Sequence, residues 1–242
     1  MRFVNMTPNT TTAEDITGAY RLLVRNVDDV QETDTGLTYE DRICGMHSLF
    51  VKNIAKTCIE IAWRNLGGKQ SRLSFEKTPI LVPLRKDYIK RIKDSKIKAY
   101  ILQHIENYVY KFKTDIHVNI DGKLAIGTEC KAYTENAMLK RIAVDSMFLK
   151  HAHPSAHNVL FQFESQLGGD YSDLSKDIHY GSYPTHTILS YFDDVDLHII
   201  TLLEGERKVD RPIHKKDFFK KLNRGSIGQA IKIFEDLLQD KV

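Results

Sequence analysis

Three residues near the middle of the chain have the types and the spacing that metal-assisted hydrolysis of a phosphodiester would use. Thirteen residues separate Asp115 from Glu129, and Lys131 follows two positions later; these three residues are called the triad below. Two carboxylates can hold a hard divalent cation through oxygen and leave positions for water and a phosphate oxygen. The lysine ammonium could orient the attacking water and neutralise the transition state or, when deprotonated, act as the base. The residues alone leave the role of Lys131 open.

The segment that carries the triad alternates as a β-hairpin does. Large apolar side chains occupy even positions within residues 116–126, whereas polar and small side chains occupy odd positions from 115 to 131. Because successive side chains of a strand point to opposite faces, the triad is predicted to share one face. Keeping the apolar residues of both strands on the other face requires an odd number of loop residues. We therefore expect a three-residue loop, Ile120-Asp121-Gly122, with Gly122 in the left-handed region.

This hairpin resembles that of the PD-(D/E)xK nuclease superfamily, and of type II restriction endonucleases in particular. Their pattern is an acidic residue that opens one strand and an E-x-K on the next, matched here by Thr114-Asp115 and Glu129-Cys130-Lys131. The resemblance covers residues 38–165. It implies that Asp115 and Glu129 are metal ligands, that Lys131 is the catalytic lysine and that Mg²⁺ is the cofactor.

The first acid of this pattern has a rival. Thr114 stands where the family often has proline, and Asp121 is a second acidic residue on the same hairpin. Asp is expected beside Gly122 for local turn geometry, which favours Asp115 as the metal ligand.

A helix residue often adds a carboxylate in this family, and Glu40 and Glu60 are the candidates here. Glu40 lies on the apolar seam of its helix, whereas Glu60 shares its side with Lys56 and Arg64. We take Glu40 as a further candidate metal ligand. The alternative is a first-turn acid that interacts favourably with the helix dipole.

The elements around the hairpin predict an α/β fold, a restriction-endonuclease-like core with a central mixed β-sheet flanked by helices. Helical periodicity is found after Thr12, over 38–65 with Gly67 and Gly68 at its end, over 97–108, after an N-cap at Thr134, and after a capping box at 226–229. Strands are expected at 72–77, 159–163, 187–192 and 195–203. We expect one nuclease domain over 1–242, with its core at 38–165 and the segment 186–240 packed on it.

The net charge of +3 is too small to imply a polyanionic partner, but the basic residues cluster in two runs. Each run could form a surface that tracks DNA phosphates, or could be a solvated helix face. The first run contains Arg85, Lys86, Lys90, Arg91, Lys93, Lys96 and Lys98, and the second contains Lys208, Arg211, Lys215, Lys216, Lys220, Lys221 and Arg224.

Other site types receive less support from the sequence. His151, His153 and His157 flank Pro154, but no cysteine or acidic residue stands nearby at a zinc-ligand spacing, so a loop that contacts DNA or nothing is the preferred interpretation. The chain lacks a G-x-x-x-x-G-K-[ST] loop and a G-x-S-x-G elbow, so no nucleotide cofactor and no serine hydrolase chemistry are expected.

The location is expected to be cytoplasmic. The opening MRFVNMTPNTTT has no apolar core of a signal peptide, and no window approaches the roughly 18 apolar residues of a membrane span. Cys44, Cys58 and Cys130 stand at long spacings that match no disulfide framework, so they are predicted to be reduced thiols.

The function that these observations predict is Mg²⁺-dependent, sequence-specific hydrolysis of double-stranded DNA that leaves 5′-phosphates. The resemblance implies a homodimer, because two-fold symmetry matches a palindromic site and supplies one active site per strand. Two alternatives stay open: a DNA repair or junction-resolving nuclease of the same fold, and a non-catalytic nuclease-like module that binds DNA.

Overall fold

The computed structural model describes residues 12, 14–18, 20, 39–174, 181–208, 210, 220–222 and 224–242, with side chains from Leu49 onward in the long helix that begins at Tyr39. At its centre lies a five-stranded sheet in the order β1-β4-β5-β6-β7. The strands are β1 (Leu73–Ser74), β4 (Ile116–Ile120), β5 (Lys123–Glu135), β6 (His157–Gln166) and β7 (Leu197–Thr201). β4 is antiparallel to β1 and β5, whereas β6 and β7 continue parallel to β5.

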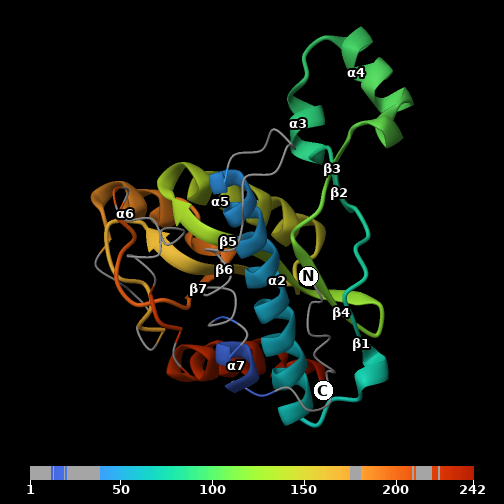
Figure 1. Ribbon diagram of the computed structural model, residues 1–242. Coiled ribbons are helices and arrows are strands. Elements are labelled where there is room, and N and C mark those ends of the chain that lie inside the picture. The colour runs from blue at the N-terminus through green and yellow to red at the C-terminus, as the bar shows by residue number, and fades with distance from the viewer. Residues whose placement is uncertain are drawn as a thin grey trace.

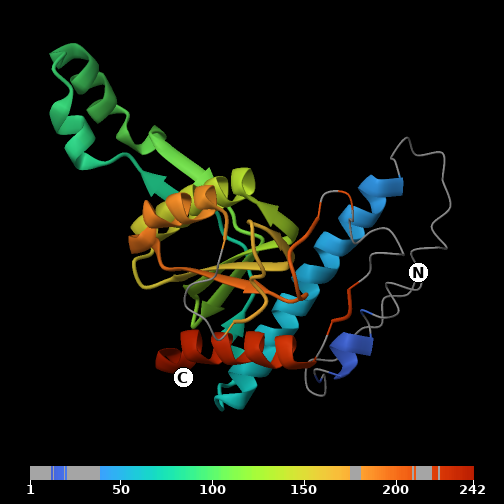
Figure 2. The ribbon, with the colours of Figure 1, turned by 90° about the vertical axis from the view of Figure 1, so that its left-hand side faces the viewer.

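Helices cover both faces of this sheet, which confirms the predicted α/β fold with a central mixed sheet (Figure 1). On one face, α2 (Tyr39–Asn65) and α7 (Arg224–Leu238) pack against each other and against the strands. On the other face lie α5 (Asn136–Ala152) and α6 (Tyr183–Ser190). The perpendicular view in Figure 2 also shows α2 and α7 on one side of the sheet and α5 and α6 on the other.

The larger core lies beneath α2 and α7. Trp63, Phe161 and Phe234 are fully buried there, and the thiols of Cys58 and Cys130 are free and buried. Burial raises the pKa of Cys58 to about 12, so this thiol stays protonated at neutral pH. Although α2 has 27 residues, no helix in the described part of the chain is both long and apolar enough to cross a membrane.

The end of α2 follows the prediction from its two glycines. Gly67 has a φ of 79°, and the Gly68 N–H donates to the Trp63 carbonyl oxygen over 2.9 Å. A Cβ on Gly68 would lie 2.2 Å from the Trp63 ring. The chain can therefore close the helix only because the backbone at Gly68 approaches the indole directly.

The turn of the β4–β5 hairpin differs from the expected three-residue loop. Ile120 pairs with Lys123, so the loop has two residues, Asp121 and Gly122, with φ angles of 51° and 75°. Gly122 is left-handed as expected, but Asp121 is left-handed too, which is the geometry of a type I′ turn.

The two-residue turn alone would place the apolar side chains of β4 and β5 on opposite faces, and a β-bulge in β5 corrects this. Asn119 pairs with Leu124 but Val118 pairs with Ile126, so Ala125 is an extra residue on β5. Leu124 consequently packs in the cluster on the α5 side, whereas Ile126 packs beneath α2 and α7. The bulge therefore restores the alternation beyond it, including the part of β5 that carries the triad.

Several predicted boundaries are wrong for local reasons. Thr134 still belongs to β5, so α5 begins later and has no side-chain cap at Glu135. The segment predicted as a strand at 187–192 is mostly helical, because Ser182 caps α6 by accepting a hydrogen bond from the Thr185 N–H. The predicted strand at 72–77 is only the short β1, and α7 begins before the proposed capping box.

A two-stranded sheet that was not predicted carries a projecting helical pair. β2 (Ile80–Pro83) pairs with β3 (Val109–Phe112), and the chain between them forms α3 (Lys86–Arg91) and α4 (Ser95–Gln103). This pair stands away from the main body in Figure 1 and Figure 2. Short 3-10 turns complete the described elements: Gln70–Arg72, Ile105–Asn107, Asp193–Val195 and Gln239–Lys241.

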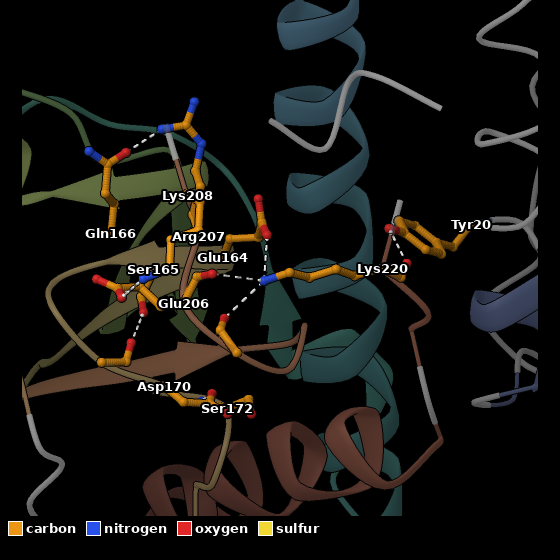
Figure 3. A network of polar contacts seen from close by, with 12 residues as sticks. Tyr20, Glu164, Ser165, Gln166, Asp170, Ser172, Glu206, Arg207, Lys208 and Lys220 are labelled. Carbon is orange, nitrogen blue, oxygen red and sulfur yellow. Dashed lines mark hydrogen bonds and ion pairs between the residues drawn. The ribbon is translucent and has the colours of Figure 1, made fainter. Parts of the chain in front are cut away.

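A buried ion pair ties the segment before α7 to β6. Glu164 is fully buried, and its Oε1 lies 2.7 Å from Lys220 Nζ. Lys220 Nζ also donates to the Gly205 carbonyl over 3.0 Å, and the Tyr20 hydroxyl donates to the Lys220 carbonyl over 2.9 Å (Figure 3). Distant parts of the chain therefore meet at one lysine, and the network has a structural role.

Candidate active site

The structure brings the three triad residues together. Asp115 directly precedes β4, while Glu129 and Lys131 lie on β5, and pairing of Ile116 with Thr128 sets Asp115 opposite Glu129. The Lys131 Nζ lies 3.1 Å from Asp115 Oδ2 and 2.7 Å from Glu129 Oε2. Both carboxylates therefore contact the same ammonium group, on one side of the sheet.

Asp115 has two further anchors. The Cys130 N–H donates to Asp115 Oδ2 over 3.0 Å, and Lys52 Nζ lies 2.9 Å from Asp115 Oδ1. Lys52 comes from α2 and was missed by the sequence reasoning. Its sole signal in the sequence is a charged residue in a largely apolar helical stretch, which does not say which acid it will meet.

The electrostatics of the two carboxyl groups diverge. Burial tends to raise the pKa of Asp115, but hydrogen bonds from Lys52 and Cys130 and the charge of Lys131 outweigh it and hold that pKa well below its usual range. Burial raises the pKa of Glu129, and neighbouring Asp115 adds to the rise, although Lys131 opposes both. Asp115 is thus firmly ionised, whereas the charge on Glu129 is costly.

Lys131 responds to these neighbours in the opposite direction. Burial alone would lower the pKa of its ammonium, but the charges and hydrogen bonds of Glu129 and Asp115 raise it overall. In this arrangement Lys131 is a protonated donor shared by two carboxylates.

A cavity of about 640 Å³ opens beside the triad. It lies between β3, β5 and α5, and basic, acidic and aromatic side chains line it. Burial raises the pKa of one of these, Asp145, despite the opposing charges of Arg141 and Lys131. The lining residues are Tyr110, Phe112, Lys113, Asp115, Glu129, Lys131, Lys140, Arg141, Val144, Asp145 and Phe148.

The rival acid Asp121 is engaged elsewhere. It lies in the turn at the far end of β4 from Asp115, roughly 20 Å along an extended chain. Both of its oxygens accept hydrogen bonds from the Arg72 guanidinium over 2.9–3.1 Å. Its position therefore has a local structural explanation, and the structure does not group it with the triad.

The helix acids are not brought into the cluster by any described contact. The side chain of Glu40 lies outside the described part of the chain, and its backbone precedes Lys52 by twelve residues of α2, roughly 18 Å along the axis. Glu60 is half-buried, and burial raises its pKa against the charges of Lys56 and Arg64. Glu60 is not among the described groups that shift the pKa of Asp115 or of Glu129.

The two basic runs are separated by the fold. The first lies on α3, α4 and their connection, and therefore on the projecting helical pair. Three of the seven residues in the second run, Arg211, Lys215 and Lys216, fall outside the described residues. Of the others, Lys208 pairs with Glu206, Arg224 pairs with Glu14, and Lys220 is used in the buried ion pair with Glu164. Lys220 is thus not available as a phosphate contact.

The chemistry of the donor set at the triad fits a hard divalent cation. Two carboxylates converge at a partly open site, and both are compensated by ammonium groups, one of which they share. Anionic oxygen donors in a cavity that admits water are what Mg²⁺ accepts. Asp115 and Glu129 are the residues that would hold it.

Comparison with known proteins gives one clear likeness. The chain is 44% identical over 230 residues to the type II restriction enzyme DdeI of Desulfomicrobium norvegicum, and the match spans 90% of this chain and 94% of that protein. No family model matches the chain, and no solved structure matches it. An identity of this size over nearly the whole length of both chains establishes a common family.

Proposed function

We propose, from the premise that this chain belongs to the family of type II restriction enzymes, that Asp115, Glu129 and Lys131 are its catalytic centre for cleaving double-stranded DNA. The observation that carries the assignment is the meeting of both carboxylates at Lys131 Nζ, over 3.1 and 2.7 Å, beside an open cavity. Such a centre can supply the chemistry of a site-specific deoxyribonuclease, and the hairpin pattern supports membership of the PD-(D/E)xK superfamily.

Mg²⁺ is the proposed cofactor, with Asp115 and Glu129 as its protein ligands. When bound, a divalent cation supplies Lewis-acid stabilisation of the phosphate and makes water more acidic. Asp115 is held in a fixed orientation by the Cys130 N–H, so its carboxylate is oriented before any ligand arrives. Glu129 gains most from a cation, because burial makes its charge costly without a positive partner.

Lys131 is proposed to stabilise charge rather than to act as the base. Its raised pKa keeps the ammonium protonated while it lies between the two carboxylates. A protonated amine at that point can donate to a phosphate oxygen or orient the attacking water.

DNA is proposed to approach over the cavity and the projecting helical pair. Lys113, Lys140 and Arg141 line the cavity and can contact phosphates beside the scissile bond. The first basic run lies on α3 and α4, which project from the main body (Figure 2). Positive side chains there would supply affinity without sequence preference.

The assembly and the product follow from the same proposal. One nuclease domain per chain with one triad cuts one strand, so a homodimer with two-fold symmetry would cut both strands of a palindromic site. Hydrolysis would leave 5′-phosphate ends, and the protein would act in the cytoplasm.

The test is cleavage of plasmid DNA by purified protein with Mg²⁺, against a chelator control. Discrete fragments that a ligase can rejoin without added kinase would support site-specific cutting with 5′-phosphate ends. Light scattering after size-exclusion chromatography gives the oligomeric state. A smear, nicking at arbitrary positions, or absence of metal-dependent cleavage would contradict the assignment.

Glu129→Gln and Asp121→Asn form a matched pair on the same hairpin. Each removes one carboxylate charge with little change of shape, but only Glu129 belongs to the triad. Loss of cutting in the first with retention in the second would support the site; equal effects would count against it.

A further inference from the structure

Two histidines and an aspartate meet at the sheet edge formed by β6 and β7. His157 is the first residue of β6, Asp196 directly precedes β7, and His198 is the second residue of β7. The parallel register pairs Val159 with His198, which sets Asp196 beside His157. One nitrogen of each imidazole and one carboxylate oxygen all lie within 4.8 Å of one another.

This cluster lies on the opposite face of the sheet from the triad. His157 pairs with Ile126, whose side chain packs beneath α2 and α7. Glu129 shares its face with Gly127, where a Cβ would meet Leu149 of α5. The cluster is therefore separate from the active-site cavity, and a ligand bound there would not be the catalytic metal.

The two imidazole nitrogens that face Asp196 are buried from solvent. Among the described residues, neither His157 Nδ1 nor His198 Nε2 has a hydrogen-bond partner. The distances to the Asp196 oxygens are 3.8 Å and 3.4 Å, and neither contact has hydrogen-bond geometry. Buried polar atoms are almost always satisfied, so two such nitrogens aimed at one carboxylate indicate a missing partner.

Asp196 is the most exposed side chain of the cluster. Its φ is 55°, in the left-handed region that aspartate tolerates at some cost. The carboxylate is half exposed, whereas the histidine side chains are more covered. An ion from solvent can therefore reach the oxygens first and then meet the two nitrogens.

The donor set selects the class of ion. Two imidazole nitrogens and one carboxylate are typical ligands of Zn²⁺, whereas Mg²⁺ prefers oxygen ligands alone. With bonds of about 2.1 Å, tetrahedral ligands lie about 3.4 Å apart. The observed 3.4 and 3.8 Å between the histidine nitrogens and Asp196 need little adjustment to reach this spacing.

We propose that His157, Asp196 and His198 bind a zinc ion that cross-links the starts of β6 and β7. Three protein ligands leave a fourth position for water. The ion fastens β7, the edge strand of the sheet, and takes no part in phosphodiester cleavage. Because this site uses neither the triad nor its cavity, it stands independently of the proposed catalytic function.

Zinc binding is measured on tag-free protein that has been dialysed against a chelator and then titrated with ZnCl₂. We expect about one zinc ion per chain, and absorption bands of a four-coordinate site when Co²⁺ replaces zinc. Asp196→Asn keeps a side chain that tolerates the left-handed backbone, so it should fold. It should weaken zinc binding by on the order of 100-fold or more, as should His198→Gln.

Two control variants separate this site from others on the chain. His151→Gln removes an exposed histidine from the same histidine-rich stretch, and Glu129→Gln alters the active site. Both should bind zinc as the unaltered protein does, and zinc should raise the melting temperature in both. Circular dichroism without zinc checks that every variant folds.

The opposite pattern overturns the proposal. Unaltered protein that takes up no more zinc than Asp196→Asn would show that the cluster is not a zinc site. Zinc binding that is lost in Glu129→Gln but retained in Asp196→Asn would place the ion at the triad instead.

Discussion

Two polar clusters occupy opposite faces of the same sheet, and they are compensated in different ways. At the triad, every carboxylate has a cationic partner at 2.7–3.1 Å, and Lys131 serves both acids. At the His157 cluster, two buried nitrogens face a carboxylate without a hydrogen bond. The carboxylates of the first cluster must exchange their ammonium partners to bind a cation, whereas the second cluster lacks a partner.

The difference suggests different functions for bound metal. A site that holds its carboxylates with lysines can release them to a cation and to DNA, which suits a catalytic centre that cycles. At the histidine cluster, the ion itself would be the missing partner of the two buried nitrogens. Such a site on adjacent strand ends suits a structural cross-link.

The largest expected effect is the loss of DNA cleavage on substitution of Lys131, which should leave the histidine cluster unchanged. Lys131→Ala should lower the cleavage rate at least about 1000-fold, because the protonated donor at the reacting phosphate is lost. DNA binding, measured by fluorescence anisotropy with Ca²⁺ in place of Mg²⁺, should persist. Zinc content should not change. Cleavage equal to that of the unaltered protein would remove Lys131 from the catalytic centre.

The next effect is a gain in the free energy of unfolding when zinc binds the histidine cluster, with little change in cleavage at the triad. When free zinc is about 100 times its Kd, binding should add about 2.7 kcal/mol to the free energy of unfolding. Chemical denaturation with and without zinc measures this gain, which should vanish in Asp196→Asn. Cleavage by that variant should stay near normal at low temperature. A variant that unfolds normally but no longer cuts DNA would argue for a catalytic role of the cluster.

A smaller effect is the loss of folding stability caused by the ionised Glu129 carboxylate in the active site. Because burial raises the pKa of Glu129 in the folded protein, its ionisation opposes folding. The penalty is absent below the ordinary value of 4.5 and develops as the pH rises through the raised pKa. Glu129→Gln should therefore raise the free energy of unfolding of chelator-treated protein at neutral pH. Unfolding curves at neutral and acidic pH should show this gain shrinking in acid.

The smallest effect is expected at the turn. Asp121→Asn weakens an exposed ion pair with Arg72 and touches neither cluster, so cleavage should stay within about twofold of normal. Zinc binding should be unaffected. A large loss of cutting would revive Asp121 as the first metal ligand and would undermine the place given to Asp115.

Much of the candidate active site could be predicted because it is local. The β-period of two and a short connection place Asp115 opposite Glu129 with few alternatives. The triad shares one face although the predicted turn was wrong. The expected loop had one residue more than the observed turn, and the bulge at Ala125 supplies that extra residue. Lys52 could not be predicted, because its contact with Asp115 depends on how α2 packs on the sheet.

The histidine cluster shows the opposite case. From the sequence, His157 had no acidic partner at a ligand spacing, and zinc was set aside for that reason. Asp196 and His198 come from β7, a strand that reaches His157 through parallel pairing. Parallel strands are joined by long crossovers, so their register cannot be counted along the chain.

The sequence by itself determined the α/β class, the hairpin and the common face of the triad, because strand alternation and a short turn are properties of neighbouring residues. The tertiary structure alone decided which cations hold Asp115, where the projecting helical pair stands, and that His157 meets β7. Those contacts join residues far apart in the chain, and their geometry depends on the packing of whole elements rather than on local periodicity.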